Sequence, residues 1–238
     1  MSSLDVEGLG PDRWPIGFEQ DLHRKRFANF SQPFTGTDCL AYLGVDFVPR
    51  WGDILQGRPA SELAAYFIWL RIAENRFDID AVIDANRLLG GSVAMRAGQI
   101  VSTRFKSGHL LRFDCDQEPR TFLREWLREF NKPCLPDQAI ERGIWLFVDF
   151  LVAHPFFEGN GRTARLLFQA YLHAQGLMPA PLLPLSPFIF ANEKAYLNAL
   201  WAWEFFDQPD EFYRFMISAI TKIKEVAKNS NRSFQFQF

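Results

Sequence analysis

The sequence predicts an all-α helical bundle with one small β-hairpin. Apolar residues recur at helical spacing from Ser61 to about residue 226. Only two short runs favour β-structure, and they flank the turn residues Ser107 and Gly108. The chain has 238 residues, of which 48% are hydrophobic, and a net charge of −2. A disordered chain is therefore excluded, because so much apolar surface with so little net charge favours one substantial core.

The predicted elements follow one another along the chain. Residues 1–58 are rich in Gly and Pro, so we expect an irregular N-terminal arm with one short helix near 19–30. The helical domain should span 59–228, and residues 229–238 should form a C-terminal tail. Helical spacing predicts helices within 61–73, 78–89, 120–130, 137–153, 163–174, 193–206 and 210–226. Residues 99–105 and 110–113 should pair as the hairpin.

Composition excludes several classes of protein. No apolar run approaches the ~18 to 20 residues that span a bilayer, and the N-terminus lacks a basic stretch followed by an apolar one. We therefore expect a cytoplasmic protein with no membrane partner. The 26 basic and 28 acidic residues argue against nucleic-acid binding. The three cysteines show no C-x-x-C spacing, so neither a disulfide framework nor a zinc site is indicated.

One 12-residue window carries the chemistry. The helix within 137–153 should end at His154, because the residue before Pro155 is pushed out of the helical region. A loop with Gly159 and Gly161 then leads directly into the next helix. Free backbone N–H groups and the positive end of the helix dipole meet there, so the segment predicts an anion site, with phosphate as the natural ligand.

The polar residues of this window suit a phosphate-bearing ligand. Arg162 and Arg165 are three residues apart and should share one helix face, where they could hold successive phosphates. Glu158 is placed to ligate Mg²⁺, which takes hard oxygen ligands. His154 is suited to accept a proton near neutral pH. Each feature alone is common in tight turns and on solvated helix faces, but their combination in one window indicates a functional site.

The run His154-Pro-Phe-Phe-Glu-Gly-Asn-Gly-Arg-Thr-Ala-Arg165 resembles the signature of the Fic family, H-P-F-x-[D/E]-G-N-G-R-x-x-R, at every defined position. The resemblance implies a Fic-type helical bundle that transfers AMP from ATP to a hydroxyl of another protein and releases pyrophosphate. His154 would be the catalytic base and Glu158 the Mg²⁺ ligand. The α- and β-phosphates would lie in a cradle formed by Gly159, Asn160 and Gly161. Arg162 would hold the β-phosphate and Arg165 the γ-phosphate.

The resemblance also implies a mode of target binding. The hairpin near Ser102–Phe113 is similar to the family's flap, which aligns a target protein by strand addition. In the family a glycine precedes an arginine before the flap, whereas here Arg96 precedes Gly98, so the register of the flap stays open. Gly161 argues against the variant of the family that phosphorylates its target, which has lysine there.

Other reactions remain open at this stage. The motif leaves the base-binding part of the site undefined, so the donor could be another nucleotide or a CDP-linked compound, or the reaction could remove AMP. A non-catalytic interaction module is a further alternative. The sequence does not identify the target protein, the modified residue or the oligomeric state.

Regulation also leaves alternatives. Many Fic proteins are inhibited by a helix with the pattern [S/T]-x-x-x-E-[G/N], whose glutamate pairs with the second motif arginine. Residues 3–8 fit this pattern and offer Glu7. Residues 221–225 offer Glu225, but Val226 breaks the last position. A separate antitoxin protein, or no inhibition, is the third possibility.

Overall fold

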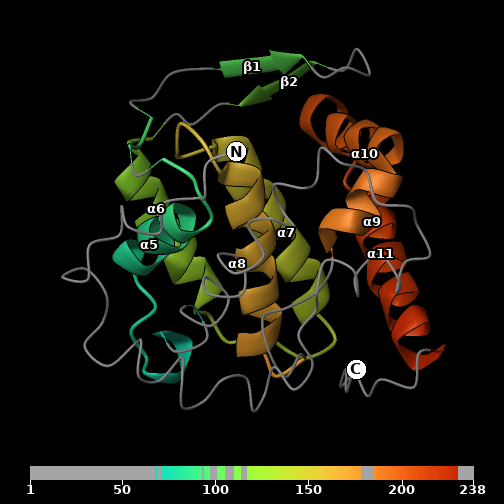
Figure 1. Ribbon diagram of the computed structural model, residues 1–238, viewed down its shortest axis with the longest axis horizontal. Helices are drawn as coiled ribbons and strands as arrows, with labels where there is room; N and C mark the ends of the chain where they lie inside the picture. The colour runs from blue at the N-terminus through green and yellow to red at the C-terminus, as the bar shows by residue number, and fades with distance from the viewer. Residues whose placement is uncertain are drawn as a thin grey trace, which may run out of the picture.

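Two long helices, α7 (Ala139–Ala153) and α8 (Asn160–Ala174), run side by side through the centre of the protein (Figure 1). The computed structural model describes residues 68, 71–92, 94–96, 101–104, 110–113, 117–177 and 185–229. The expected arm at 1–58 lies outside these residues, as does the expected tail except for residue 229. None of the described helices is long and apolar enough to cross a membrane.

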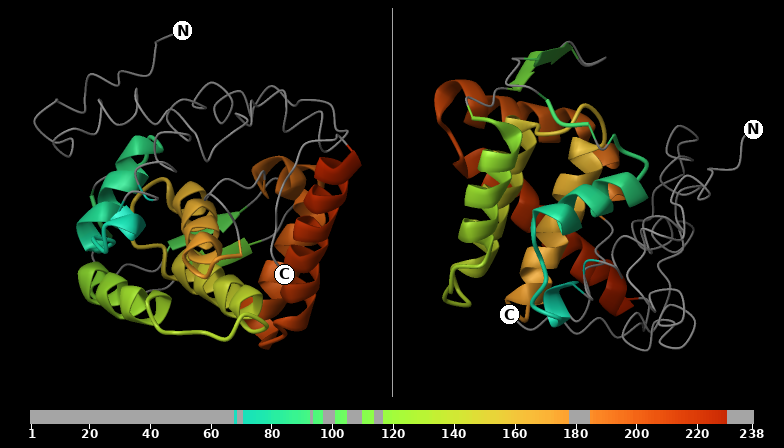
Figure 2. Two further views of the ribbon diagram at one scale, coloured as in Figure 1. Left: turned by 90° about the horizontal axis from the view of Figure 1, so that it is seen from below. Right: turned by 90° about the vertical axis from the view of Figure 1, so that its left-hand side faces the viewer.

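The other helices flank this central pair on two sides. Helices α5 (Ile79–Leu88) and α6 (Pro119–Phe130) lie on one side. Helices α9 (Leu185–Ala191), α10 (Glu193–Phe206) and α11 (Asp210–Asn229) lie on the other, an arrangement that Figure 2 shows from two further directions. The prediction of a mostly helical bundle is therefore confirmed.

Local sequence explains where the flanking helices begin. The carboxylate of Asp78 accepts a hydrogen bond from the backbone N–H of Ala81 at 2.9 Å and caps α5. Glu118 caps α6 in the same way through Thr121, also at 2.9 Å, and Pro119 occupies the first helical position. Both arrangements satisfy N–H groups that a helix start otherwise leaves without a partner.

The start of α7 and the presence of α9 differ from the prediction. Helix α7 begins at Ala139, because a tight turn over 136–138 precedes it and no side chain caps it, so Asp137 does not open the helix. Helix α9 was not predicted. Its Pro187 is tolerated because it lies in the first turn, where a helix needs no N–H donor.

Aromatic side chains form much of the core between the helices. The indole of Trp126 in α6 packs edge-on against Phe150 in α7, with ring centroids 5.5 Å apart. Its Nε1–H also donates to the carbonyl of Leu146 at 2.9 Å, within the buried core. Phe130 meets Tyr171 of α8 in the same edge-on way at 5.4 Å. These contacts fix α6 against the central pair.

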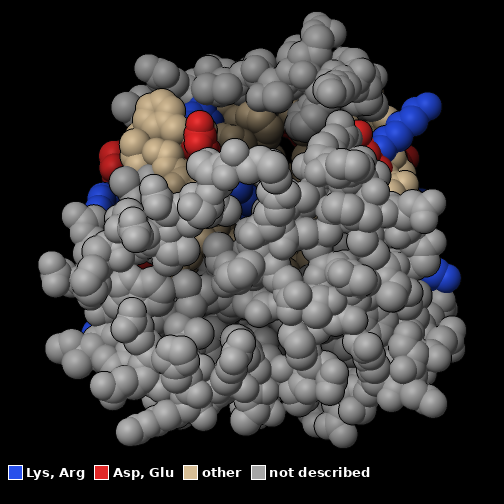
Figure 3. All heavy atoms as spheres, viewed as in Figure 1, with Lys and Arg blue, Asp and Glu red and all other residues tan. Residues whose placement is uncertain are grey.

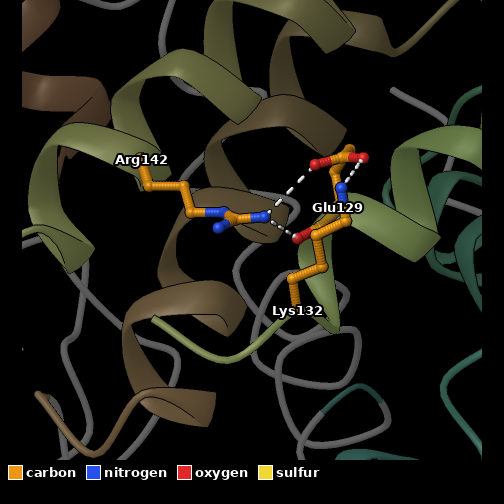
Figure 4. A network of polar contacts seen from close by, with 3 residues as sticks. All are labelled: Glu129, Lys132 and Arg142. Atoms are coloured by element: carbon orange, nitrogen blue, oxygen red, sulfur yellow. Dashed lines mark hydrogen bonds and ion pairs between the residues drawn. The ribbon is translucent and has the colours of Figure 1, made fainter. Parts of the chain in front are cut away.

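A charged network ties the end of α6 to the start of α7 (Figure 4). One guanidinium nitrogen of Arg142 donates to the backbone carbonyl of Glu129 at 2.9 Å and to its carboxylate at 3.2 Å. Lys132 pairs with the other carboxylate oxygen. On the face seen in Figure 3, both basic and acidic side chains of the described residues are visible.

Two short strands lie across one end of the bundle (Figure 1). Strand β1 (Val101–Arg104) pairs antiparallel with β2 (Leu110–Phe113), and Val101 lies opposite Phe113. The residues between the strands, 105–109, lie outside the described part. The role of these strands as a flap stays a prediction.

Candidate active site

His154 ends α7 in a left-handed conformation, with φ 49° and ψ 55°. Its backbone N–H still donates to the carbonyl of Phe150 at 3.1 Å, so the residue closes the last turn of the helix. Pro155 follows, and a residue before proline avoids the right-handed helical region. The chain therefore leaves the helix sharply, with the imidazole at the helix end.

Two neighbours hold the His154 ring. Its Nδ1 lies 3.1 Å from the carbonyl oxygen of Leu151, and the ring stacks on Phe113 of β2 with centroids 4.0 Å apart. Because a carbonyl only accepts hydrogen bonds, Nδ1 carries the proton of the neutral ring and Nε2 keeps its lone pair. Burial lowers the pKa of His154 to about 4, opposed by the bond to Leu151 and assisted by the cation of Arg96. The imidazole is therefore neutral at pH 7.

Arg96 joins the hairpin to the end of α7. Its guanidinium donates to the carbonyl oxygens of His154 and Phe113, each at 3.3 Å, and its backbone N–H donates to Pro155 at 2.9 Å. The side chain is buried. One cation thus links the two residues whose rings are stacked. The sequence shows that Arg96 precedes Gly98, but no local pattern predicts its hydrogen bonds to His154 and Phe113.

The first turn of α8 includes residues that were predicted to lie in a loop. The helix begins at Asn160 rather than Thr163, since Gly159 adopts φ +88° and its carbonyl accepts the first intrahelical bond, from Thr163, at 2.9 Å. No side chain caps this helix start. The N–H groups of Asn160, Gly161 and Arg162 precede the first intrahelical bond, so they face the open end of α8.

At the N-terminal end of α8, Asn160 offers its backbone N–H group to a ligand, because its side chain is already hydrogen-bonded. Its amide oxygen accepts from the N–H of Phe156 at 2.9 Å, and its amide nitrogen donates to the carbonyl of Phe156 at 2.7 Å. The side chain is buried. It therefore closes the loop on itself, and only the N–H of Asn160 remains for a ligand.

The two motif arginines have different surroundings. Arg162 donates to the carbonyl of Gly90 at 3.3 Å. The guanidinium of Arg165 lies beside Gly161, 3.5 Å from where a β-carbon would be. Among the described residues, no carboxylate pairs with Arg165. The pKa of Arg165 is lowered to about 10, mainly by burial; Tyr196 opposes this shift, and the cation of Arg162 adds to it. An anion bound here would offset the cost of burying the charged guanidinium and its repulsion by Arg162.

Glu158 presents an exposed carboxylate next to the open end of α8. No group of three potential metal-binding side chains occurs in the described part of the chain. A single carboxylate nevertheless fits Mg²⁺, because this ion is commonly held by one or two carboxylates together with substrate phosphates. Glu158 would then be the protein ligand.

The inhibitory roles of Glu7 and Glu225 stay predictions. Glu7 lies outside the described residues. Glu225 lies within α11, but its side chain is not described.

Asn86 on α5 is a further residue at this end, and sequence analysis missed it. It is fully buried and hydrogen-bonds to the carbonyl of Glu158 and the hydroxyl of Thr163. One asparagine in an amphipathic helix gives no local signal of such a contact.

The fold and the site together define a helical domain in which a glycine loop and a helix N-terminus form a candidate anion site beside a neutral histidine. Residues 76–172 match the Fic/DOC family, and these residues form a Fic domain within the chain.

Relatives in animals extend this finding. The chain is 29% identical over 108 residues to protein adenylyltransferase fic-1 of Caenorhabditis elegans, covering 44% of this chain and 21% of that protein. It is 34% identical over 105 residues to protein adenylyltransferase Fic of Nematostella vectensis, covering 42% and 24%. The matched stretch thus spans less than a quarter of the length of these relatives.

A solved structure supports the fold. A Fic family protein from Desulfovibrio desulfuricans superposes with a TM-score of 0.58 at 18% sequence identity, covering 94% of this chain and 72% of that one. At this identity the likeness concerns the fold alone.

Proposed function

We propose that the Fic domain is a protein adenylyltransferase, which moves AMP from MgATP to a Ser, Thr or Tyr hydroxyl of a target protein. The observation that carries this proposal is the combination at the start of α8. A neutral imidazole with an available Nε2, three N–H groups and a half-buried arginine that pairs with no carboxylate of the described residues all belong to one motif. The names of the animal relatives favour the same reaction.

The reaction joins two substrates. The hydroxyl oxygen of the target attacks the α-phosphorus of ATP, and Nε2 of His154 takes the hydroxyl proton. The bond from the α-phosphorus to the oxygen that bridges to the β-phosphate breaks, and pyrophosphate leaves with that electron pair. The negative phosphates should raise the pKa of His154 from its value in the free protein, and the ring then becomes a better base.

The remaining motif residues bind the nucleotide. The N–H groups at the start of α8 would hold the α- and β-phosphates, Arg162 the β-phosphate and Arg165 the γ-phosphate. Glu158 would hold Mg²⁺, which neutralises phosphate charge when bound. Removal of the γ-phosphate contact would leave the reacting phosphorus poorly aligned.

The target would lie along the hairpin. The sheet has two strands, so in the described part each has an edge without a pairing neighbour. An extended target segment could add to such an edge through main-chain hydrogen bonds. Because Phe113 of β2 stacks on His154, a segment placed on this hairpin would approach the catalytic base.

The test uses ATP labelled at the α- or the γ-phosphate, with a cell lysate as the source of targets. We expect label from the α-phosphate in a target protein and none from the γ-phosphate, and no label with His154→Ala. His173→Ala removes a histidine near the far end of α8 and is the matched control. Transfer of the γ-phosphate would indicate a kinase. Transfer only from another nucleotide, measured by the added mass, would indicate a different donor. Activity of His154→Ala equal to wild type would refute the proposed mechanism.

A further inference from the structure

Asn86 is a fully buried amide with three hydrogen-bond partners, one just after α5 and two in the motif segment. Its Nδ2 donates to the carbonyl of Ser92 at 2.6 Å and to the carbonyl of Glu158 at 3.2 Å. Its Oδ1 accepts from the hydroxyl of Thr163 at 2.7 Å. Both amide hydrogens and the oxygen are thus used, and no other side chain of this size supplies two donors and an acceptor in this order.

Two glycines press against this amide. A β-carbon on Gly91 or on Gly159 would lie 2.3 Å from Oδ1 of Asn86. A β-carbon on Gly159 would also lie 2.9 Å from the Cα of Gly91. The backbone of the motif loop therefore rests directly on Asn86, with no room for a side chain between them.

The hydrogen bonds of Asn86 hold the motif loop at residues on both sides of the open end of α8. Glu158 precedes Gly159, and Thr163 follows the three residues whose N–H groups face the ligand. Thr163 is itself fully buried. A displacement of the loop would break both hydrogen bonds and leave buried polar atoms without partners, so one conformation is favoured.

We propose that Asn86 is a positioning residue for nucleotide binding: it holds the loop from Glu158 to Thr163 so that the N–H groups of the first turn of α8 converge on phosphate. This inference rests on the proposed function of the loop. Asn86 lies 72 residues before Glu158 and outside the family motif. Its effect should appear in nucleotide affinity and not in affinity for the target protein.

The test compares Asn86→Asp with Asn131→Asp. The first change keeps the shape of the side chain but removes both donors, and it sets a carboxylate oxygen against two carbonyls. The second makes the same chemical change at the exposed end of α6. Each is made in the full chain carrying His154→Ala, so that ATP binds without turnover. Thermal melting establishes that each variant is folded at the temperature of the titration.

For folded Asn86→Asp we expect the Kd for MgATP to rise tenfold or more, and for Asn131→Asp less than twofold. In chains with His154 intact, the KM for ATP should rise while the KM for the target stays the same. A residue that only stabilises the fold would change the melting temperature without this selective effect. Equal ATP affinity would overturn the inference and leave the proposed function standing. Absence of ATP binding by the wild-type chain would overturn both.

A second pair of variants covers the case in which Asn86→Asp does not fold. Thr163→Val removes the hydroxyl that donates to Asn86, and Thr163→Ser restores it. The valine variant should bind ATP more weakly, and the serine variant should regain most of the lost affinity. If both bind equally, Asn86 has no positioning role.

Discussion

The neutral state of His154 makes the stability of the protein depend on pH. The pKa of this ring is about 4 in the folded protein, against 6.5 for an exposed histidine. The unfolded chain therefore binds more protons between these values, so the contribution is fully present above pH 6.5 and is lost as pH falls through 4. At pH 5 the loss should be about 2 kcal/mol relative to pH 7.5.

A second titratable group, the half-buried Asp149, opposes this trend. Burial raises the pKa of Asp149 from 3.8 to about 6, and the negative charge of Glu129 adds to this shift. Its contribution is present below pH 3.8 and is lost as pH rises through 6, in the same window but with the opposite sign. In a plot of the free energy of unfolding against pH, the contribution of Asp149 would mask that of His154. The contribution of His154 must therefore be measured as the difference in stability between the wild-type chain and a variant without this histidine.

The assay compares urea unfolding of wild type and His154→Asn at pH 7.5 and 5. Asparagine does not titrate and tolerates the left-handed backbone found here. The stability difference should shift by about 2 kcal/mol in favour of the variant at pH 5. NMR titration should give a pKa near 4 for His154, and Phe113→Ala should raise it by admitting water to the ring. An imidazole titrating near 6.5 in the wild-type chain would refute this account of the half-buried base.

Three further predictions concern the core, the metal ion and regulation. Trp126→Phe removes the buried bond to the carbonyl of Leu146 and should destabilise the protein by about 1 to 3 kcal/mol in urea unfolding, whereas no change would show that water replaces the indole. Glu158→Gln should abolish the dependence of ATP affinity on Mg²⁺ in calorimetric titration, and an unchanged dependence would remove this residue from the metal role. Glu7→Gly should increase auto-modification with labelled ATP many-fold and Glu225→Gly should not, because loss of an inhibitory carboxylate frees the γ-phosphate position. If neither changes the rate, an antitoxin partner becomes the explanation to test.

Local patterns account for most of the helices. The predicted range 193–206 coincides with α10, and 120–130 differs from α6 by one residue. Both helices bury one apolar face, and the helical spacing of their apolar residues is visible directly in the sequence. The start of α8 differed by three residues, because the left-handed Gly159 sets the first turn and its conformation depends on the packing around it.

The sequence by itself determined the helical class, the helix that ends at His154, and the motif residues that point to phosphate chemistry. These are local properties of periodicity, proline and spacing. The tertiary structure alone decided that Phe113 covers the imidazole and that Asn86 supports the loop. It also turned the side chain of Asn160 away from a ligand and onto Phe156. Such contacts join segments that are far apart in the sequence, or use one of several possible hydrogen-bond partners. Packing of the whole chain, rather than local propensity, decides which contacts form.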